Sequence, residues 1–137
     1  MLILSNGAYG RRQAQICHSA GIPHTVLEQP EDRALDPAAA ELLLSAGSYT
    51  AVTVVHCETS SGVLNPVEAI GRRVRQLQPR AAFVVDSMSA FGAVPLDMEA
   101  AGVDYLVSSA NKCIEGVPGF GFAICRLAHL RTTEGEG

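Results

Sequence analysis

Short runs of apolar residues alternate along the chain with longer segments in which apolar and polar residues are mixed. The runs are rich in Val, Ile, Phe and Ala and are bounded by Gly, Pro, Asn or Ser, which is typical of strands buried on both faces. We predict strands over residues 2–4, 24–27, 52–56, 82–85, 105–107 and 121–125. Strands of this kind favour a parallel sheet covered by helices on both sides.

The mixed segments carry the start and stop signals of helices. The clearest case has Asp36 as N-cap, Pro37 at the first helical position and Gly47 just beyond its end. We predict helices over residues 9–20, 36–46 and 65–78, and one or two helical turns over residues 97–101. The alternation of strands and helices predicts an α/β fold, a three-layer α/β/α domain with a mostly parallel sheet. Residues 132–137 are predicted to be a frayed end.

The composition excludes several classes of protein. A chain of 137 residues that is 47% hydrophobic and 18% charged is not intrinsically disordered. A net charge of −4 leaves no basic surface for nucleic acid. The apolar runs are far shorter than a bilayer span, so we predict a cytoplasmic protein with no membrane partner. The four cysteines are predicted to be reduced, because a chain of this size does not need disulfides.

Polar side chains follow three of the apolar runs. Thr59 comes after the third predicted strand, Asp86 directly after the fourth, and Ser109, Asn111 and Lys112 after the fifth. Ligands of open parallel sheets bind beyond the carboxyl ends of the strands. We therefore expect these residues to line one edge of the sheet.

Lys112 is the only lysine of the chain, whose other basic residues are all arginines. A lysine can lose its proton and form a Schiff base, which an arginine cannot do. A carboxylate such as Asp86 can hold a proton on a pyridine nitrogen. The alternatives are a solvated surface lysine, a turn or N-cap carboxylate at Asp86, and a loop around Thr59 that bonds its own backbone.

Two other patterns carry less weight. His56, Cys57 and Cys113 match no zinc spacing, so no metal site is predicted. The glycines of residues 116–121 precede a strand instead of opening a helix, so they do not form a dinucleotide fingerprint.

The chain resembles the class V aminotransferases, which are pyridoxal 5'-phosphate (PLP) enzymes of fold type I. The resemblance rests on HCETSSGVLNP (residues 56–66), VVDSMSAFGAVPLDM (84–98) and DYLVSSANKCIEGVPGFGFAICR (104–126), and extends to ILSNGAYGRR (3–12). These blocks follow one another in the order and spacing of the family.

The resemblance implies a role for each candidate residue. Lys112 matches the lysine that binds PLP covalently and shuttles the proton, and Asp86 matches the partner of the pyridinium nitrogen. Thr59 matches the contact to the ring hydroxyl. Ser109 and Asn111 match contacts to the phosphate, and Ser89 is a further candidate for cofactor binding. The implied reaction moves the amine of 2-aminoethylphosphonate to pyruvate, giving phosphonoacetaldehyde and alanine.

The resemblance also implies the organisation of the protein. Residues 1–137 match a single partial domain, the middle of the cofactor-binding large domain, without the preceding segment that cradles the phosphate and without the small domain that follows. The family implies a homodimer. Two alternatives remain: an alanine- or serine-glyoxylate aminotransferase of the same class, or a non-catalytic α/β fragment. We expect the isolated chain to fold poorly or to associate through exposed apolar faces.

Overall fold

A computed structural model describes residues 1–135, which form one α/β unit around a six-stranded sheet. The strand order is β2-β1-β3-β6-β7-β8, and all neighbours are parallel except β7 and β8. The strands are β1 (Leu2–Ser5), β2 (Thr25–Glu28), β3 (Ala51–Val55), β6 (Ala82–Asp86), β7 (Tyr105–Ser109) and β8 (Gly121–Cys125). All six predicted strands are confirmed, with ends that differ by at most two residues.

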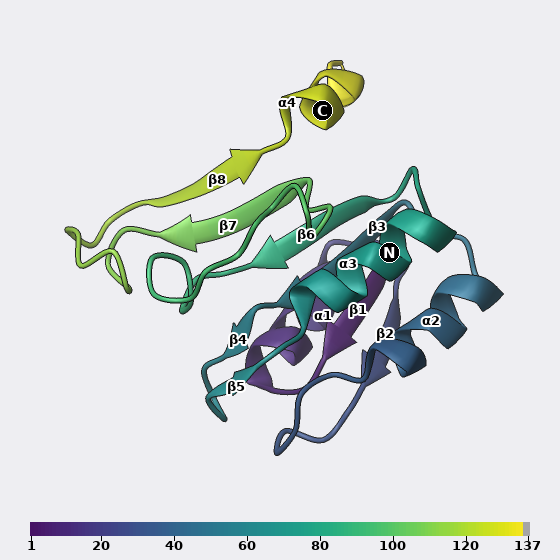
Figure 1. Cartoon of the computed structure of the whole chain (residues 1–137), viewed down its shortest axis with the longest axis horizontal. Coiled ribbons are helices and arrows are strands. Elements are labelled where there is room, and N and C mark those ends of the chain that lie inside the picture. Colours follow the sequence, from purple (N-terminus) through teal and green to yellow (C-terminus); the bar gives the residue numbers. More distant parts are fainter. Residues whose placement is uncertain (136–137) are drawn as a thin grey trace.

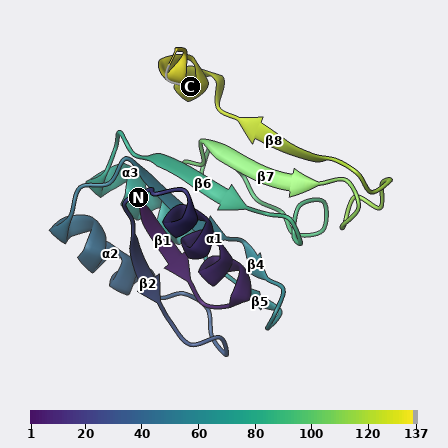
Figure 2. The ribbon, with the colours of Figure 1, turned by 180° about the vertical axis from the view of Figure 1, so that it is seen from behind.

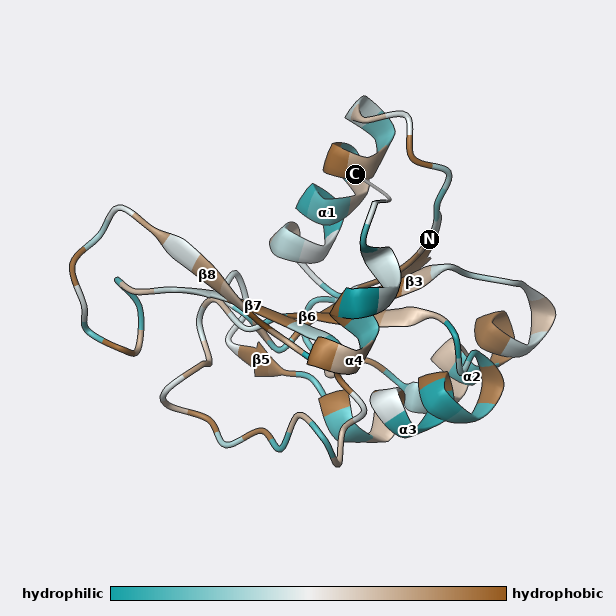
Figure 3. Ribbon diagram, turned by 90° about the horizontal axis from the view of Figure 1, so that it is seen from above, coloured by the Kyte–Doolittle hydropathy of each residue, from teal (hydrophilic) through white to brown (hydrophobic). Residues whose placement is uncertain are grey.

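Three helices cover the sheet, namely α1 (Ala8–Ser19), α2 (Pro37–Ala46) and α3 (Val67–Leu77). Helices α2 and α3 pack against each other on one face (Figure 1), and α1 lies on the opposite face (Figure 2). The edge-on view in Figure 3 shows the sheet between these two layers. The prediction of a three-layer α/β domain with a mostly parallel sheet is therefore confirmed.

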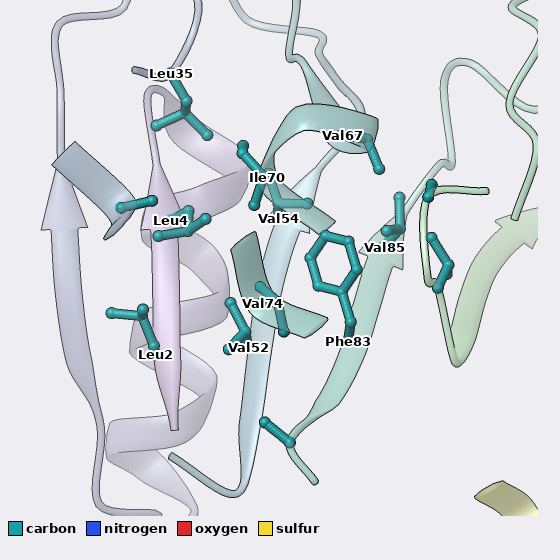
Figure 4. Close-up of a cluster of buried hydrophobic side chains, with 14 of the residues drawn as sticks. Leu2, Leu4, Leu35, Val52, Val54, Val67, Ile70, Val74, Phe83 and Val85 are labelled. Atoms are coloured by element: carbon teal, nitrogen blue, oxygen red, sulfur yellow. The ribbon is translucent and has the colours of Figure 1, made fainter. Parts of the chain in front are cut away.

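The hydrophobic core lies between the sheet and the α2–α3 layer. Val54 and Phe83 of the sheet pack there against Ile70 and Val74 of α3 (Figure 4), and all four side chains are fully buried. Burial of a side chain of this size contributes roughly 1.5–3 kcal/mol. The core thus fixes α3 and the central strands, whose carboxyl ends carry the candidate residues.

Local capping follows the predicted signals. The Asp36 side chain accepts a hydrogen bond from the Ala38 amide at 2.8 Å, as expected for the N-cap of α2. Residues 97–101 form a single turn, closed by the bond from the Ala101 amide to the Asp97 carbonyl at 2.9 Å. Gly102 ends this turn at φ +65°, a conformation that glycine adopts without strain.

Two features were not predicted. The chain after β3 forms a hairpin of β4 (Cys57–Glu58) and β5 (Val63–Leu64), whose strands are too short to show a pattern in the sequence. The end of the chain folds into α4 (Leu127–Leu130) and a 3-10 turn, Arg131–Thr133. The predicted frayed end is therefore wrong for residues 132 and 133, while residues 136 and 137 lie outside the described part. None of the helices within residues 1–135 has the length and apolar character needed to cross a membrane.

Candidate functional site

The candidate residues gather at the carboxyl ends of three neighbouring strands. Thr59 lies in the β4–β5 hairpin that follows β3, Asp86 is the last residue of β6, and Ser109 is the last residue of β7. Asn111 and Lys112 follow in the turn after β7. Because β3, β6 and β7 are adjacent and parallel, the hairpin and both loops leave the sheet at the same edge (Figure 1). The expected convergence at one edge is confirmed.

Asp86 is half-buried, and both of its carboxylate oxygens have donors. The Met88 amide donates to Oδ1 at 3.1 Å, and Nε2 of Gln13, on α1, donates to Oδ2 at 3.4 Å. The first bond is the turn contact considered for an aspartate at this position, but it uses one oxygen only. The carboxylate is therefore held at the strand end with acceptor capacity to spare.

Ser109 carries a buried hydroxyl whose Oγ has no hydrogen-bond partner among residues 1–135. A buried polar atom without a partner destabilises the fold by about 1–3 kcal/mol. A phosphate oxygen or another ligand atom would satisfy it. The neighbouring Ser108, by contrast, donates to the Ser87 carbonyl at 3.3 Å and joins the ends of β7 and β6.

Lys112 and Asn111 are exposed in the turn that follows β7. The turn is closed by bonds from the Gly116 amide to the Ala110 carbonyl at 2.7 Å and from the Glu115 amide to the Lys112 carbonyl at 2.8 Å. Described residues therefore fix the backbone at Lys112, but they do not bury its side chain. The partial burial that would favour a neutral amine is not provided by residues 1–135.

Glu58 fixes the hairpin that carries Thr59. Its carboxylate is fully buried and accepts hydrogen bonds from the amides of Tyr9 and Gly10, in the first turn of α1, at 3.2 Å. Ser60 adds a hydroxyl donor at 3.0 Å. Since this carboxylate already occupies the positive end of the α1 dipole, a phosphate group is not expected to bind there.

Ser89 joins two of the loops at this edge. Its hydroxyl donates to the Cys57 carbonyl at 2.8 Å, which ties the loop after β6 to the hairpin after β3. Ser89 therefore has a clear structural contact within the chain, whereas Thr59 is exposed.

His56 lies beneath this edge and is buried. Its Nδ1 is 3.0 Å from Ser87 Oγ, and burial lowers the pKa of the imidazole below its ordinary value. Among residues 1–135 no group of three or more His, Cys, Asp or Glu side chains is arranged to hold a metal ion, and the four cysteines are unpaired.

This arrangement suits a phosphorylated pyridine cofactor. Asp86 offers a carboxylate to a protonated ring nitrogen, and Ser109 offers an unsatisfied buried hydroxyl to a phosphate. Lys112 offers the primary amine that a Schiff base requires. Sequence reasoning missed Gln13 and Glu58, which hold these groups. The one available signal was Thr53, a polar residue inside an apolar strand run, which indicates a buried polar partner.

Comparison with known proteins links this geometry to one family. The sequence profile of the family described as Aminotransferase class-V matches residues 11–135. The chain is 47% identical over 137 residues to the 2-aminoethylphosphonate–pyruvate transaminase of Syntrophobacter fumaroxidans, and covers 36% of that protein. It is 43% identical over 136 residues to the enzyme of the same name from Aeromonas hydrophila, and covers 35% of it. The chain thus spans about a third of the length of these relatives.

Solved structures show the same fold. The pyridoxamine-pyruvate aminotransferase of Mesorhizobium loti superimposes with a TM-score of 0.87 at 29% identity, covering 98% of this chain and 34% of that one. The alanine–glyoxylate aminotransferase of a Nostoc species superimposes with a TM-score of 0.88 at 23% identity, covering 98% of this chain and 35% of that one.

Proposed function

Because the chain belongs to the class V aminotransferase family, we propose that it supplies the cofactor-binding centre of a PLP-dependent transaminase. The proposed reaction moves the amine of 2-aminoethylphosphonate to pyruvate, giving phosphonoacetaldehyde and alanine. The observation that carries the proposal is the meeting of Asp86, Ser109 and Lys112 at one edge of the sheet. The choice of amino donor is supported by relatives of that name at 40–47% identity.

Each residue has a distinct task in this proposal. When bound, PLP supplies an aldehyde that reacts with amines and a pyridinium ring that withdraws electrons. Lys112 Nζ would hold the cofactor covalently, and as a free amine it would accept and return the proton that transamination moves. Asp86 keeps the proton on the ring nitrogen.

The remaining candidates orient the cofactor. Thr59 binds the ring hydroxyl, and Ser109 and Asn111 bind the phosphate. Ser109 is the best supported of these, because its buried hydroxyl lacks a partner among the described residues. Ser89 contributes by holding the hairpin and the loop after β6 together. The proposal also includes residues 1–137 as one part of the large domain and a homodimeric protein, both from the family resemblance. It further includes a cytoplasmic location, which rests on the shortness of the apolar runs.

Absorbance spectroscopy with PLP tests this function directly. We expect the chain to bind PLP with a saturable visible band, and Lys112→Ala to abolish the band. Asp86→Ala should shift the band, because the ring nitrogen loses its counter-charge. Borohydride reduction followed by peptide mapping should find the cofactor on Lys112.

A matched control separates a built site from general amine labelling. Arg72→Lys in the Lys112→Ala background provides an exposed amine on α3, and it should not restore the band. Addition of 2-aminoethylphosphonate to the loaded chain should remove the band, whereas L-serine should not. A band that survives Lys112→Ala would contradict the proposal. Absence of any band would favour the non-catalytic alternative.

A further inference from the structure

Gln13 is a half-buried residue of α1 that has no task in the proposed function, although it contacts a residue that does. Its side chain bridges two strands of the sheet. Thr53 Oγ1, on β3, donates to Gln13 Oε1 at 3.0 Å, and Gln13 Nε2 donates to Asp86 Oδ2, on β6, at 3.4 Å.

The chemistry of the partners fixes the orientation of this amide. An ionised carboxylate only accepts hydrogen bonds, so the NH2 group of Gln13 must face Asp86. The amide oxygen must then face Thr53, whose buried hydroxyl is able to donate. The amide therefore has one stable orientation, in which it points a donor at the carboxylate.

The donor comes from a firmly held element. Helix α1 packs on β1 and β3, and its first turn is anchored by the buried carboxylate of Glu58. Asp86 has one other donor among the described residues, the Met88 amide, which bonds its other oxygen. Gln13 thus supplies the second of two points that fix the rotation of the carboxylate about its side-chain bonds.

We propose that Gln13 is a positioning residue that holds the Asp86 carboxylate in the orientation in which it serves the ring nitrogen of PLP. This inference rests on the proposed function, because the task of Asp86 belongs to it. Gln13 does not touch the cofactor in this scheme and acts only through Asp86.

A double-mutant cycle in PLP affinity tests the proposal. Gln13→Leu removes the donor at nearly constant volume and should weaken PLP binding about tenfold, as expected for a hydrogen bond to a charged group. Gln15→Leu is the matched control, because Gln15 is exposed on the same helix, and it should leave affinity unchanged. In an Asp86→Asn background, Gln13→Leu should have little further effect. Equal losses in both backgrounds would overturn the proposal.

A pH series with Gln13→Glu provides a readout that a purely structural role would not change. At about pH 8 the new carboxylate repels Asp86, and PLP binding should be weaker than in the original chain. At about pH 5 the new carboxyl group is able to take up a proton and donate to Asp86, so the difference should shrink. A deficit that is independent of pH would contradict a positioning role.

The same variants distinguish this inference from the proposed function. Melting temperatures of the cofactor-free chain form a second cycle, in which Gln13→Leu and Asp86→Asn should be coupled because the two side chains touch. If the original chain fails to bind PLP, the proposal that residues 1–137 alone supply the PLP site is refuted, and the task assigned to Asp86 in this chain falls with it. Additive melting shifts would show that Gln13 does not hold Asp86, whatever the chain binds.

Discussion

At the scale of single residues, His56 couples stability to pH. Burial lowers the pKa of its imidazole in the folded chain, whereas the unfolded chain has the ordinary value of about 6.5. Unfolding below that pH therefore takes up a proton at His56. The free energy of unfolding should decrease as the pH falls through about 6.5, and this loss should level off below the folded-state pKa.

Urea unfolding at about pH 7.5 and about pH 5.5 measures this dependence. His56→Gln, which is able to keep a bond to Ser87, should reduce the difference between the two pH values. His18→Gln serves as control because His18 is exposed at the end of α1. If His56→Gln and the original chain lose the same free energy between the two conditions, His56 is not the titrating group.

Residue types in the sequence predicted which side chains lie at the carboxyl ends of neighbouring strands, but not which hydrogen bonds hold those side chains in place. A lone lysine and an aspartate after adjacent apolar runs pointed to Lys112 and Asp86, because parallel strands bring their carboxyl ends to one edge. The donors to Asp86 come from α1 and from its own turn, 73 and two residues away in sequence. Contacts over such separations depend on how the helix packs, which no local pattern specifies.

At the scale of elements, the β4–β5 hairpin and α1 stabilise each other through Glu58. Gly7 stands where α1 begins and has no capping side chain, so Glu58 supplies the acceptors for the first turn from the hairpin. A Cβ at Gly7 would lie 2.2 Å from Glu58 Cγ, which shows how closely the two elements approach. The carboxylate thus performs for α1 the task that Asp36 performs for α2.

Glu58→Ala should therefore lower the free energy of unfolding by about 2 kcal/mol, because it leaves the buried amide of Gly10 and the partly buried amide of Tyr9 without their acceptor. Denaturant unfolding measures this change. Glu99→Ala, at an exposed position, removes the same side chain where it caps nothing and should change stability little. Equal effects of the two substitutions would show that water replaces Glu58 at the helix end.

Element prediction succeeded where patterns were long or caps were local. The six strands and three helices follow from apolar runs, Gly and Pro boundaries and the Asp36–Pro37 start. The β4–β5 hairpin was not predicted, because strands of two residues show no periodicity in the sequence. The helical turns at the end of the chain were not predicted, because polar residues such as Thr132 are also typical of an unstructured tail. In the structure the Thr132 hydroxyl donates to the His129 carbonyl at 2.7 Å.

At the scale of the whole molecule, the two faces of the sheet are covered unequally. Helices α2 and α3 bury one face, whereas α1 packs on the other face over β1 and β3 and reaches β6 through Gln13. Val84, Tyr105 and Val107 on that second face are half-buried. Strand β8 forms one edge of the sheet, and the region from 114 to 130 exposes several large apolar side chains. These exposed side chains support the expectation that the chain associates through apolar faces, which stays a prediction.

Self-association of the isolated chain follows from this exposure. Val117, Phe120 and Ile124 are 77%, 62% and 39% exposed and lie in or just before the edge strand. Apolar surface next to unpaired strand backbone promotes contact between chains. Sedimentation velocity at increasing concentration should therefore show reversible association, which the combined Val117→Ser and Phe120→Ser substitutions should reduce.

A substitution at Leu42 tests whether association depends on strand β8 or on exposed apolar side chains in general. Leu42 is 74% exposed, but it lies on α2 at the well-covered face. Leu42→Ser should leave association unchanged, because its surroundings offer no unpaired strand to a second chain. A monodisperse monomer with a cooperative melt would contradict the prediction. That outcome would show that hydration of the unpaired β8 backbone stabilises the monomer more than apolar contacts of Val117, Phe120 and Ile124 stabilise the associated chains.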